Sequence, residues 1–257
     1  MKKNYTTQAI NLKNYPLNDN DSIVVMFSKT KGLLHAVAKG AKSPKSKLGA
    51  RVQMFVANDI MLYEGKNLDT IAQAQSLNTF YKIRSNLDKM SYSMYVTEIV
   101  NNFCSKTQNQ NENHEEIYNL IFKTLEKIAS SNSKKEVILN TLKFQIKIMD
   151  FLGWGLDFDF CSICQKKIEE NAFYTTNYGI LCKSCAENNP NHTNIKLNKK
   201  IKDFLSEILK TEETKYDKLI NDTVVERCFL FMKKYIDNLT SKKTKIFEVL
   251  KETAIYR

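Results

Sequence analysis

Four cysteines in two C-x-x-C pairs are the residues of this chain best suited to chemistry. The pairs are Cys161/Cys164 and Cys182/Cys185, and seventeen residues separate them. Two pairs at such a spacing are typical of a zinc site, because each tight turn points two thiolates at one ion. Four sulfurs complete the tetrahedral coordination of a structural zinc and leave no position for a reacting water. We therefore expect one structural Zn²⁺ and no metal catalysis.

Two disulfides or a redox dithiol are the alternatives for these cysteines. The chain begins Met-Lys-Lys-Asn-Tyr without an apolar h-region, which predicts a protein that is not secreted, and a reducing cytosol disfavours disulfides. A thioredoxin-like motif has one C-x-x-C beside a βαβ pattern, whereas this chain has two pairs at ribbon spacing. A zinc deaminase adds an H-x-E motif, which none of His35, His114 and His192 forms. His192 is interpreted as a solvated loop histidine, with a substitute metal ligand as the alternative. Cys104 and Cys228, on apolar helical faces, are interpreted as core thiols.

The segment between the cysteine pairs predicts the scaffold that positions them. Residues Ala172–Thr176 and Tyr178–Leu181 have the composition of two short strands, joined at Asn177. This arrangement is the hairpin of a zinc ribbon, which we expect at about residues 158–190.

Helical periodicity surrounds this ribbon. From Ser91 onward, apolar residues recur every three or four positions, as on one face of an amphipathic helix. Ser133-x-x-Glu136 is a capping box that begins a further apolar helix, which Gly153 ends. We expect a helical domain at residues 81–257, with the ribbon inserted in it. No run of eighteen apolar residues occurs, so the sequence predicts no membrane-spanning helix.

The first eighty residues predict a small β-barrel. Five short strands in about eighty residues favour an OB-fold, although an SH3-like barrel has a similar pattern. We therefore expect an α+β, multidomain protein with an N-terminal OB-fold β-barrel at residues 1–80. The expected strands are Tyr5–Lys13, Ile23–Ser28, Leu33–Lys39, Val52–Tyr63 and Leu68–Ser76.

A basic loop interrupts this barrel between the third and fourth expected strands. The formal net charge is +11, and residues 1–80 carry eleven Lys and Arg against five Asp and Glu. Cations along a flexible loop can follow a phosphate backbone and release its counterions, while a solvated loop in a Lys-rich protein is the alternative. The glycine spacing does not match a P-loop, so no nucleotide hydrolysis is implied. The acid-free loop holds Lys39, Lys42, Lys45, Lys47 and Arg51.

Two further groups are candidates for contact with nucleic acid. Aromatic residues such as Phe27, Phe55 and Tyr63 suit base stacking, although a place in the barrel core is the stronger interpretation for most of them. Lys242, Lys243 and Lys245 form a second candidate phosphate contact near the C-terminus, and the alternative is an amphipathic helix with a solvated Lys face.

Four segments resemble the bacterial recombination mediator RecO family. The first is A-I-N-L-K-N-Y, followed by D-S-I-V-V-M-F-S-K-T-K-G-L-L-H-A-V-A-K-G-A-K-S-P-K-S-K-L-G-A and the later L-Y-E-G-K. The pattern Y-I-x-x-L-x-x-K-K-x-K-x-F-x-x-L is similar to the family's C-terminal stretch. The resemblance covers essentially the whole chain and implies an OB-fold followed by a helical domain with a zinc-binding pair of C-x-x-C motifs.

The resemblance also implies a function and partners. Such proteins bind single- and double-stranded DNA, anneal complementary strands and engage the acidic C-terminal tail of single-strand-binding protein. They act with RecR to load RecA in gap repair, which predicts a non-enzymatic, cytoplasmic and nucleoid-associated protein with no membrane contact. A zinc-ribbon RNA-binding or transcription-associated factor is the alternative from the residues alone, because an OB-like barrel binds RNA as readily as DNA.

Overall fold

The computed structural model describes residues 3–104, 113–189, 195–211 and 220–240. The chain divides into two compact units, of which the first extends to Val137 and the second begins at Ile138. The predicted boundary between residues 80 and 81 stays a prediction.

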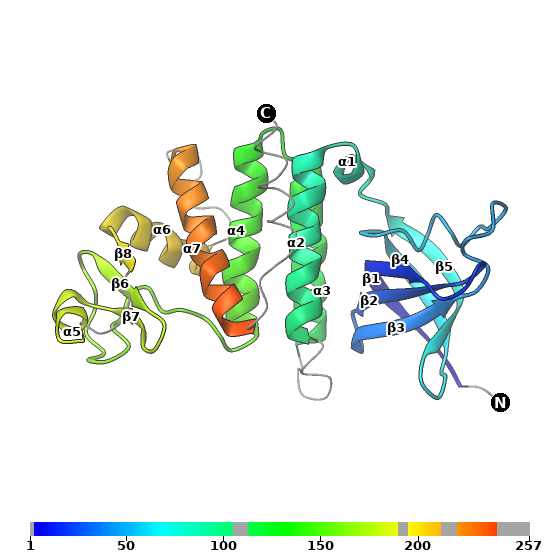
Figure 1. Ribbon diagram of the computed structural model, residues 1–257, viewed down its shortest axis with the longest axis horizontal. Helices are drawn as coiled ribbons and strands as arrows, with labels where there is room; N and C mark the ends of the chain where they lie inside the picture. The colour runs from blue at the N-terminus through cyan, green and yellow to red at the C-terminus, as the bar shows by residue number, and fades with distance from the viewer. Residues whose placement is uncertain (1–2, 105–112, 190–194, 212–219, 241–257) are drawn as a thin grey trace. The chain divides into compact units, whose positions relative to one another are not determined.

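The first unit contains a closed five-stranded barrel (Figure 1). The strand order is β1-β2-β3-β5-β4, and an antiparallel pair between β1 and β4 closes the barrel. The β3 and β5 strands form a parallel pair, and the other strand pairs of this barrel are antiparallel. This arrangement confirms the OB-like fold expected from the sequence. The strands are β1 (Asn4–Pro16), β2 (Ser22–Ser28), β3 (Gly32–Ala38), β4 (Ala57–Tyr63) and β5 (Asp69–Asn78).

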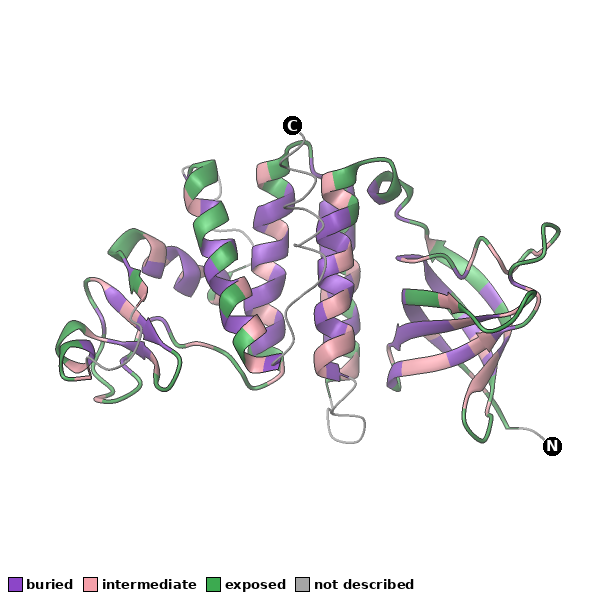
Figure 2. Cartoon of the chain, viewed as in Figure 1, coloured by how far each residue is buried: buried purple, intermediate pink, exposed green. Residues whose placement is uncertain are grey.

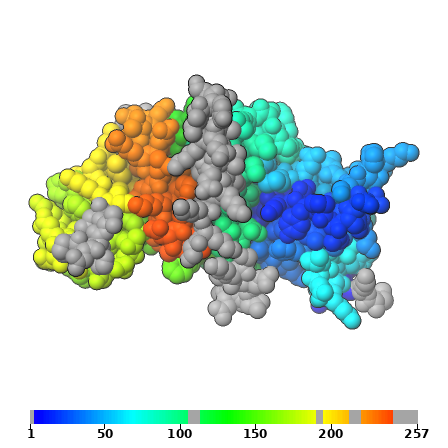
Figure 3. All heavy atoms as spheres, viewed as in Figure 1, coloured from blue at the N-terminus to red at the C-terminus, as the bar shows by residue number. Residues whose placement is uncertain are grey.

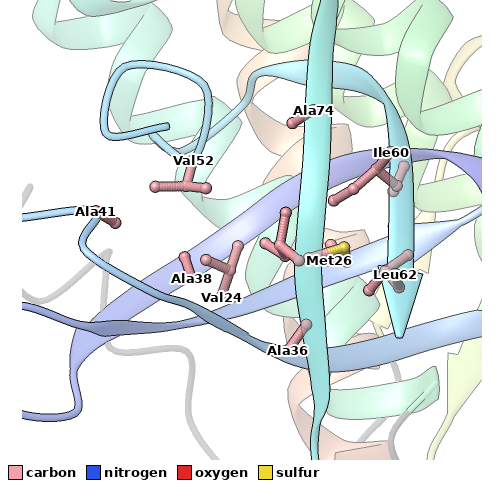
Figure 4. Packing of buried hydrophobic residues seen from close by; sticks show 11 residues of the cluster. Val24, Met26, Ala36, Ala38, Ala41, Val52, Ile60, Leu62 and Ala74 are labelled. Atoms are coloured by element: carbon pink, nitrogen blue, oxygen red, sulfur yellow. The ribbon is translucent and has the colours of Figure 1, made fainter. Parts of the chain in front are cut away.

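Small and branched apolar side chains fill the barrel (Figure 4). Alternate residues of β2, β3 and β4 point inward, because successive side chains of a strand lie on opposite faces. Ala41 and Val52, from the long connection between β3 and β4, join the same cluster. The connection is thus anchored to the barrel interior at both of its ends. The labelled core residues are Val24, Met26, Ala36, Ala38, Ala41, Val52, Ile60, Leu62 and Ala74.

The predicted start of the fourth strand is wrong. The strand was expected from Val52, but β4 begins at Ala57. The backbone N–H groups of Arg51 and Val52 both donate to the Leu48 carbonyl, which makes this segment a turn. Phe55 has a φ of 70°, a left-handed conformation outside the region of regular strands. The alternation of apolar residues here reflects the burial of a folded-back turn.

Helices complete the first unit. They are α1 (Tyr81–Arg84), α2 (Leu87–Cys104), α3 (His114–Ser130) and the first turn of α4 (Lys134–Phe151), whose residues from Ile138 belong to the second unit. The N-terminus of α3 contacts the β2–β3 hairpin: the rings of Phe27 and His114 are 6.3 Å apart, and Lys29 pairs with Glu115 at 3.0 Å. The α3 helix buries one face and exposes the other, whereas α2 has no exposed residue after Met90 (Figure 2).

The cap of α4 matches the sequence prediction. The Glu136 N–H donates to the Ser133 hydroxyl at 3.2 Å, and the Glu136 carboxylate accepts a hydrogen bond from the Asn132 N–H at 2.6 Å. These bonds satisfy N–H groups that have no partner within the helix.

The second unit contains the ribbon, which we define as β6 (Ala172–Thr175), β7 (Gly179–Leu181), β8 (Ile195–Leu197), α5 (Lys183–Glu187) and the two cysteine pairs. The β6–β7 hairpin was predicted from the sequence. The third strand, β8, which pairs with the other edge of β6, was not.

Two further helices support the ribbon. They are α6 (Lys199–Lys210) and α7 (Asp222–Thr240). The α7 helix packs its Phe231 and Tyr235 rings edge-on against Tyr174 of β6, and the Tyr235 hydroxyl donates to the Trp154 carbonyl at 2.6 Å. Among the described helices, none is long and apolar enough to cross a membrane.

Candidate metal centre and nucleic-acid interface

The four cysteines of the two C-x-x-C pairs lie together in the ribbon. The sulfurs of Cys161, Cys164, Cys182 and Cys185 are all within 4.8 Å of one another, and the Cys164 and Cys182 sulfurs are 3.8 Å apart. Cys161 is fully buried, and the other three are partly exposed. The structure therefore brings the four predicted ligands to one point.

A hydrogen-bonded turn positions the first pair. The Cys161 N–H donates to the Lys166 carbonyl at 2.9 Å, and the Gln165 N–H donates to the Cys161 carbonyl at 2.9 Å. Gln165 has a φ of 58°, which reverses the chain immediately after Cys164. Both thiols of this turn consequently face the same side.

The second pair lies where β7 ends and α5 begins. Cys182 is the N-cap of α5, and Cys185 is within this helix. The Ser162 N–H donates to the Ile180 carbonyl at 2.8 Å, which joins the turn of the first pair to β7. The two halves of the cluster are thus connected directly through the backbone.

This cluster fits a zinc ion. Zinc–sulfur bonds of about 2.3 Å in a tetrahedron place neighbouring sulfurs about 3.8 Å apart. The 3.8 Å between Cys164 and Cys182 matches this edge, and the 4.8 Å limit for all pairs leaves room for one ion. Four thiolates are also the soft ligands that zinc binds at closed structural sites.

The surroundings of the cysteines shift their pKa values in opposite directions. At Cys182, burial opposes ionisation, but hydrogen bonds from the Ser184 hydroxyl and the Cys185 backbone N–H outweigh it and lower the pKa to about 6. Burial and the neighbouring sulfurs instead raise the pKa of Cys185 to about 12. Four adjacent thiolates repel one another, so a cation at their centre is required for all four to ionise.

The basic loop, residues 39–51, projects from the barrel surface (Figure 3). Lys39, Lys42, Lys45 and Lys47 are exposed along it. Its first part is attached to the β1–β2 turn: the Gly40 N–H donates to the Asp21 carboxylate at 2.7 Å, and the Lys42 ammonium donates to the Asn18 carbonyl at 2.9 Å. The loop therefore presents cations from a fixed base.

Arg51 differs from the four lysines. It is half-buried, and its guanidinium donates to the Ala74 carbonyl of β5. Its own carbonyl accepts hydrogen bonds from the amides of Asn11, at 2.8 Å, and Asn58, at 2.9 Å. Arg51 thus anchors the root of the loop with one guanidinium nitrogen.

Sequence reasoning missed the two asparagines that hold this root. Asn11 and Asn58 are each 1% exposed, and the Asn11 amide also donates to the Gln53 carbonyl at 3.0 Å. In the sequence they look like ordinary polar residues of half-exposed strands. Only the fold reveals that their amides satisfy the carbonyls of a buried turn.

The remaining predicted residues are buried, exposed or outside the described ranges. Phe27 and Phe55 are buried in the first unit, while Tyr63 is partly exposed. Cys104 and Cys228 are buried, and burial raises the pKa of each thiol to about 12, as expected of core cysteines. His192 and the lysines Lys242, Lys243 and Lys245 lie outside the described residues.

These features define a class: an OB-type barrel protein with helices and an inserted four-cysteine ribbon of the structural-metal type. The family models of the N terminal and C terminal parts of recombination protein O match residues 1–80 and 84–245. The chain therefore belongs to the RecO family, and its role lies in DNA repair and recombination.

Two individual relatives are similar in sequence to this chain over nearly its full length and theirs. The chain is 30% identical over 251 residues to the DNA repair protein RecO of Desulforamulus reducens, covering 96% of this chain and 94% of that protein. It is 27% identical over 247 residues to the DNA repair protein RecO of Clostridium novyi, covering 95% and 93%.

Proposed function

We propose that this protein is a non-enzymatic recombination mediator that binds and anneals single-stranded DNA and also binds duplex DNA. It engages the acidic tail of single-strand-binding protein and acts with RecR to load RecA in gap repair. Membership of the RecO family supports the proposal of these partners. Its place of action is the nucleoid, in the cytoplasm, where these partners meet DNA.

The observation that carries the DNA-binding part is the basic loop. Four exposed lysines stand on a segment that contains no acid and that the barrel holds at both ends. Each lysine that meets a phosphate releases a condensed counterion, which supplies affinity without sequence preference. Annealing requires this kind of contact, because cations between two strands reduce their repulsion while the bases stay free to pair. Arg51 at the root and Lys242, Lys243 and Lys245 near the C-terminus complete the proposed contacts.

Exposed apolar side chains near the start of α2 support contact with an acidic, apolar tail. Leu87 and Met90, three residues apart on one helical face, are 53% and 38% exposed, and Tyr81 of α1 is 66% exposed. The exposed Lys82 lies next to Tyr81 in α1 and offers a positive charge to an acidic segment. An immobilised tail peptide retains the wild-type protein, and replacement of Leu87 and Met90 by Ser reduces this retention.

The ribbon is proposed to bind one structural Zn²⁺ through Cys161, Cys164, Cys182 and Cys185. Bound zinc neutralises part of the thiolate charge and fixes the two turns of the ribbon. Because the four sulfurs close the coordination shell, the ion supports the fold and takes no part in a reaction.

Removal of three loop lysines tests the DNA-binding part. Replacement of Lys42, Lys45 and Lys47 by Ala weakens single-strand binding and makes the salt dependence shallower, by roughly 0.7 in log–log slope per lost contact. The affinity is measured by fluorescence anisotropy between low and moderate salt, with DNA and RNA strands of the same sequence.

The matched control replaces Lys166, Lys167 and Lys183, three exposed ribbon lysines, and lowers the net charge equally. An equal loss of slope in both variants overturns the assignment to the loop, since the effect then follows net charge. A clear preference for RNA favours an RNA-binding factor instead.

A further inference from the structure

One helix of the second unit, α6, contacts the segment around the first cysteine pair without supplying a metal ligand. Three side chains of α6, at intervals of four residues along one face, reach the segment around this pair. The Ser206 hydroxyl donates to the Asp159 carboxylate at 2.8 Å, the Lys210 ammonium donates to it at 2.6 Å, and Lys202 lies 3.9 Å from it. We call Lys202, Ser206 and Lys210 the clamp.

The clamp also holds the other side of the same turn. The Lys202 ammonium donates to the Ile168 carbonyl at 2.8 Å, while the Ile168 N–H donates to the Asp159 carbonyl at 2.7 Å. Asp159 and Ile168 thus close a short antiparallel ladder, with a bridge between Phe160 and Lys167 inside it. Cys161 and Cys164 lie in the loop that this ladder closes.

Burial shields the bonds of Lys202 from water, whereas the Lys210 side chain is 64% exposed. The Lys202 side chain is only 4% exposed, and its ammonium also pairs with Asp203 at 2.8 Å. The buried Lys202 ammonium thus contacts Asp159, Asp203 and the Ile168 carbonyl together, which restricts the positions of all three. At the N-terminus of α6, the Lys199 N–H donates to the Asn171 side chain at 3.2 Å. This bond extends the attachment to the residue directly before β6.

The second pair is supported differently. Cys182 follows the three-residue strand β7, and Cys185 is within α5, a helix of five residues. The salt bridge on α5, between Lys183 and Glu187 at 3.8 Å, is solvent-exposed and contributes little. The cluster therefore joins a firmly held half to a half on short elements.

We propose that α6 is a positioning element for the metal site, which keeps Cys161 and Cys164 in their ligating arrangement. The second pair, Cys182 and Cys185, is then the half that opens when the ion leaves and the half whose thiols react first. This inference rests on the proposed zinc site. It gives Asp159, Lys202, Ser206 and Lys210 a role in metal retention although none of them is a ligand.

The order of thiol modification tests the clamp. The metal-loaded full-length protein is mixed with a chelator and N-ethylmaleimide, which adds to free thiolates, and mass spectrometry follows each cysteine with time. Cys182 and Cys185 are labelled before Cys161 and Cys164 in the wild type. In Asp159→Asn, which keeps the side-chain shape and removes the charge that Lys210 and Lys202 face, labelling of the first pair accelerates about tenfold. That factor corresponds to about 1.4 kcal/mol.

Glu187→Gln is the matched control, because it also removes one carboxylate charge from the ribbon, at an exposed salt bridge. Its labelling order and rates stay those of the wild type. Two results would overturn the proposed role of the clamp. One is simultaneous labelling of all four cysteines in the wild type, and the other is an unchanged labelling rate of the first pair in Asp159→Asn.

Two measurements distinguish a failure of the proposed clamp role from a failure of the proposed zinc site. If Asp159→Asn does not fold by circular dichroism, the double variant Ser206→Ala/Lys210→Ala is used, which leaves the buried Lys202 and its partners intact and predicts the same acceleration. If the purified wild type contains no zinc by elemental analysis, the proposed metal site is wrong, whereas a loaded protein with the wrong labelling order refutes only the clamp.

Discussion

At the scale of single residues, two glycines of the barrel show how a close neighbour changes the effect of one methyl group. Gly32 and Gly40 have φ values of 67° and 64°, in the left-handed region that costs other residues roughly 1–2 kcal/mol. A Cβ on Gly32 would lie 2.7 Å from Nε2 of His114, whereas a Cβ on Gly40 would have nothing within 4 Å. The two positions therefore share the backbone strain and differ in the contact.

Gly32→Ala is consequently the more damaging of the two substitutions. Besides the backbone strain, it requires the displacement of His114. This residue begins α3, and its ring packs against that of Phe27 in β2. We expect Gly32→Ala to lower the free energy of unfolding by at least about 1 kcal/mol more than Gly40→Ala. Urea denaturation followed by circular dichroism measures both, and equal losses would show that the hairpin and α3 separate easily.

Asp21 gives a residue-scale prediction that depends on pH. The hydrogen bond from the Gly40 N–H, together with one from the Asn18 amide, holds the pKa of the Asp21 carboxyl below its usual value. A lowered pKa means that the contact is complete above the unfolded pKa of about 3.9 and is lost as the pH falls through the folded value. The base of the basic loop should therefore loosen only in acid.

Nuclear magnetic resonance can follow this contact directly. The Gly40 amide signal should titrate with a midpoint below that of an ordinary aspartate, and the titration should disappear in Asp21→Asn, whose side chain carries no charge. A midpoint at or above the usual aspartate pKa would contradict the hydrogen bond.

At the scale of elements, the return leg of the basic loop depends on buried amides. Asn58→Ala removes the donor to the Arg51 carbonyl and the acceptor of the Ser76 hydroxyl at 3.1 Å. Because the Asn58 side chain is only 1% exposed, water cannot readily replace its bond to the half-buried Arg51 carbonyl, and we expect a loss of about 1–3 kcal/mol of stability, whereas the exposed Ser76 hydroxyl can bond to water instead. Faster hydrogen exchange at the amides of Arg51 and Val52 should accompany it, since both belong to the turn that Asn58 holds.

Asn14→Ala is the control for this prediction. Asn14 also donates to the return leg, to the Val52 carbonyl at 3.2 Å, but it is exposed to solvent. Water can replace its bond, so the change in stability should stay within about 0.5 kcal/mol. Equal effects at Asn14 and Asn58 would show that burial does not decide the strength of this anchor.

The same elements show what the sequence could predict. Alternating apolar residues identified the barrel strands, and the cysteine spacing identified the cluster, because both signals depend on neighbours along the chain. The start of β4 was placed at Val52 because a buried turn repeats the strand pattern over a few residues. The amides of Asn11 and Asn58 and the clamp on Asp159 join segments that are distant in sequence, and nothing local marks them.

At the scale of the whole molecule, positive charge is densest in the barrel, whereas the proposed metal ligands lie in the second unit. Residues 1–80 contribute +6 of the net +11, from eleven basic and five acidic residues. The cysteine cluster contributes about −2 when four thiolates hold one divalent ion. The proposed long-range attraction of DNA would therefore be stronger per residue in the barrel, and a ribbon loaded with the proposed metal would add no positive potential through that metal.

Metal removal should therefore affect the two units unequally. Chelation of zinc leaves four adjacent thiols without a centre, so the amides of β6, β7 and α5 in the second unit should exchange hydrogen faster, by at least about tenfold. The barrel strands in the first unit have their own apolar core and should keep their protection. Hydrogen exchange with mass spectrometry on the full-length protein measures both regions in one sample.

The salt slope of single-strand binding should also stay constant on chelation, because the loop lysines and their anchors remain folded. Equal acceleration in barrel and ribbon, or a shallower slope after chelation, would show that the metal supports the DNA-binding surface itself.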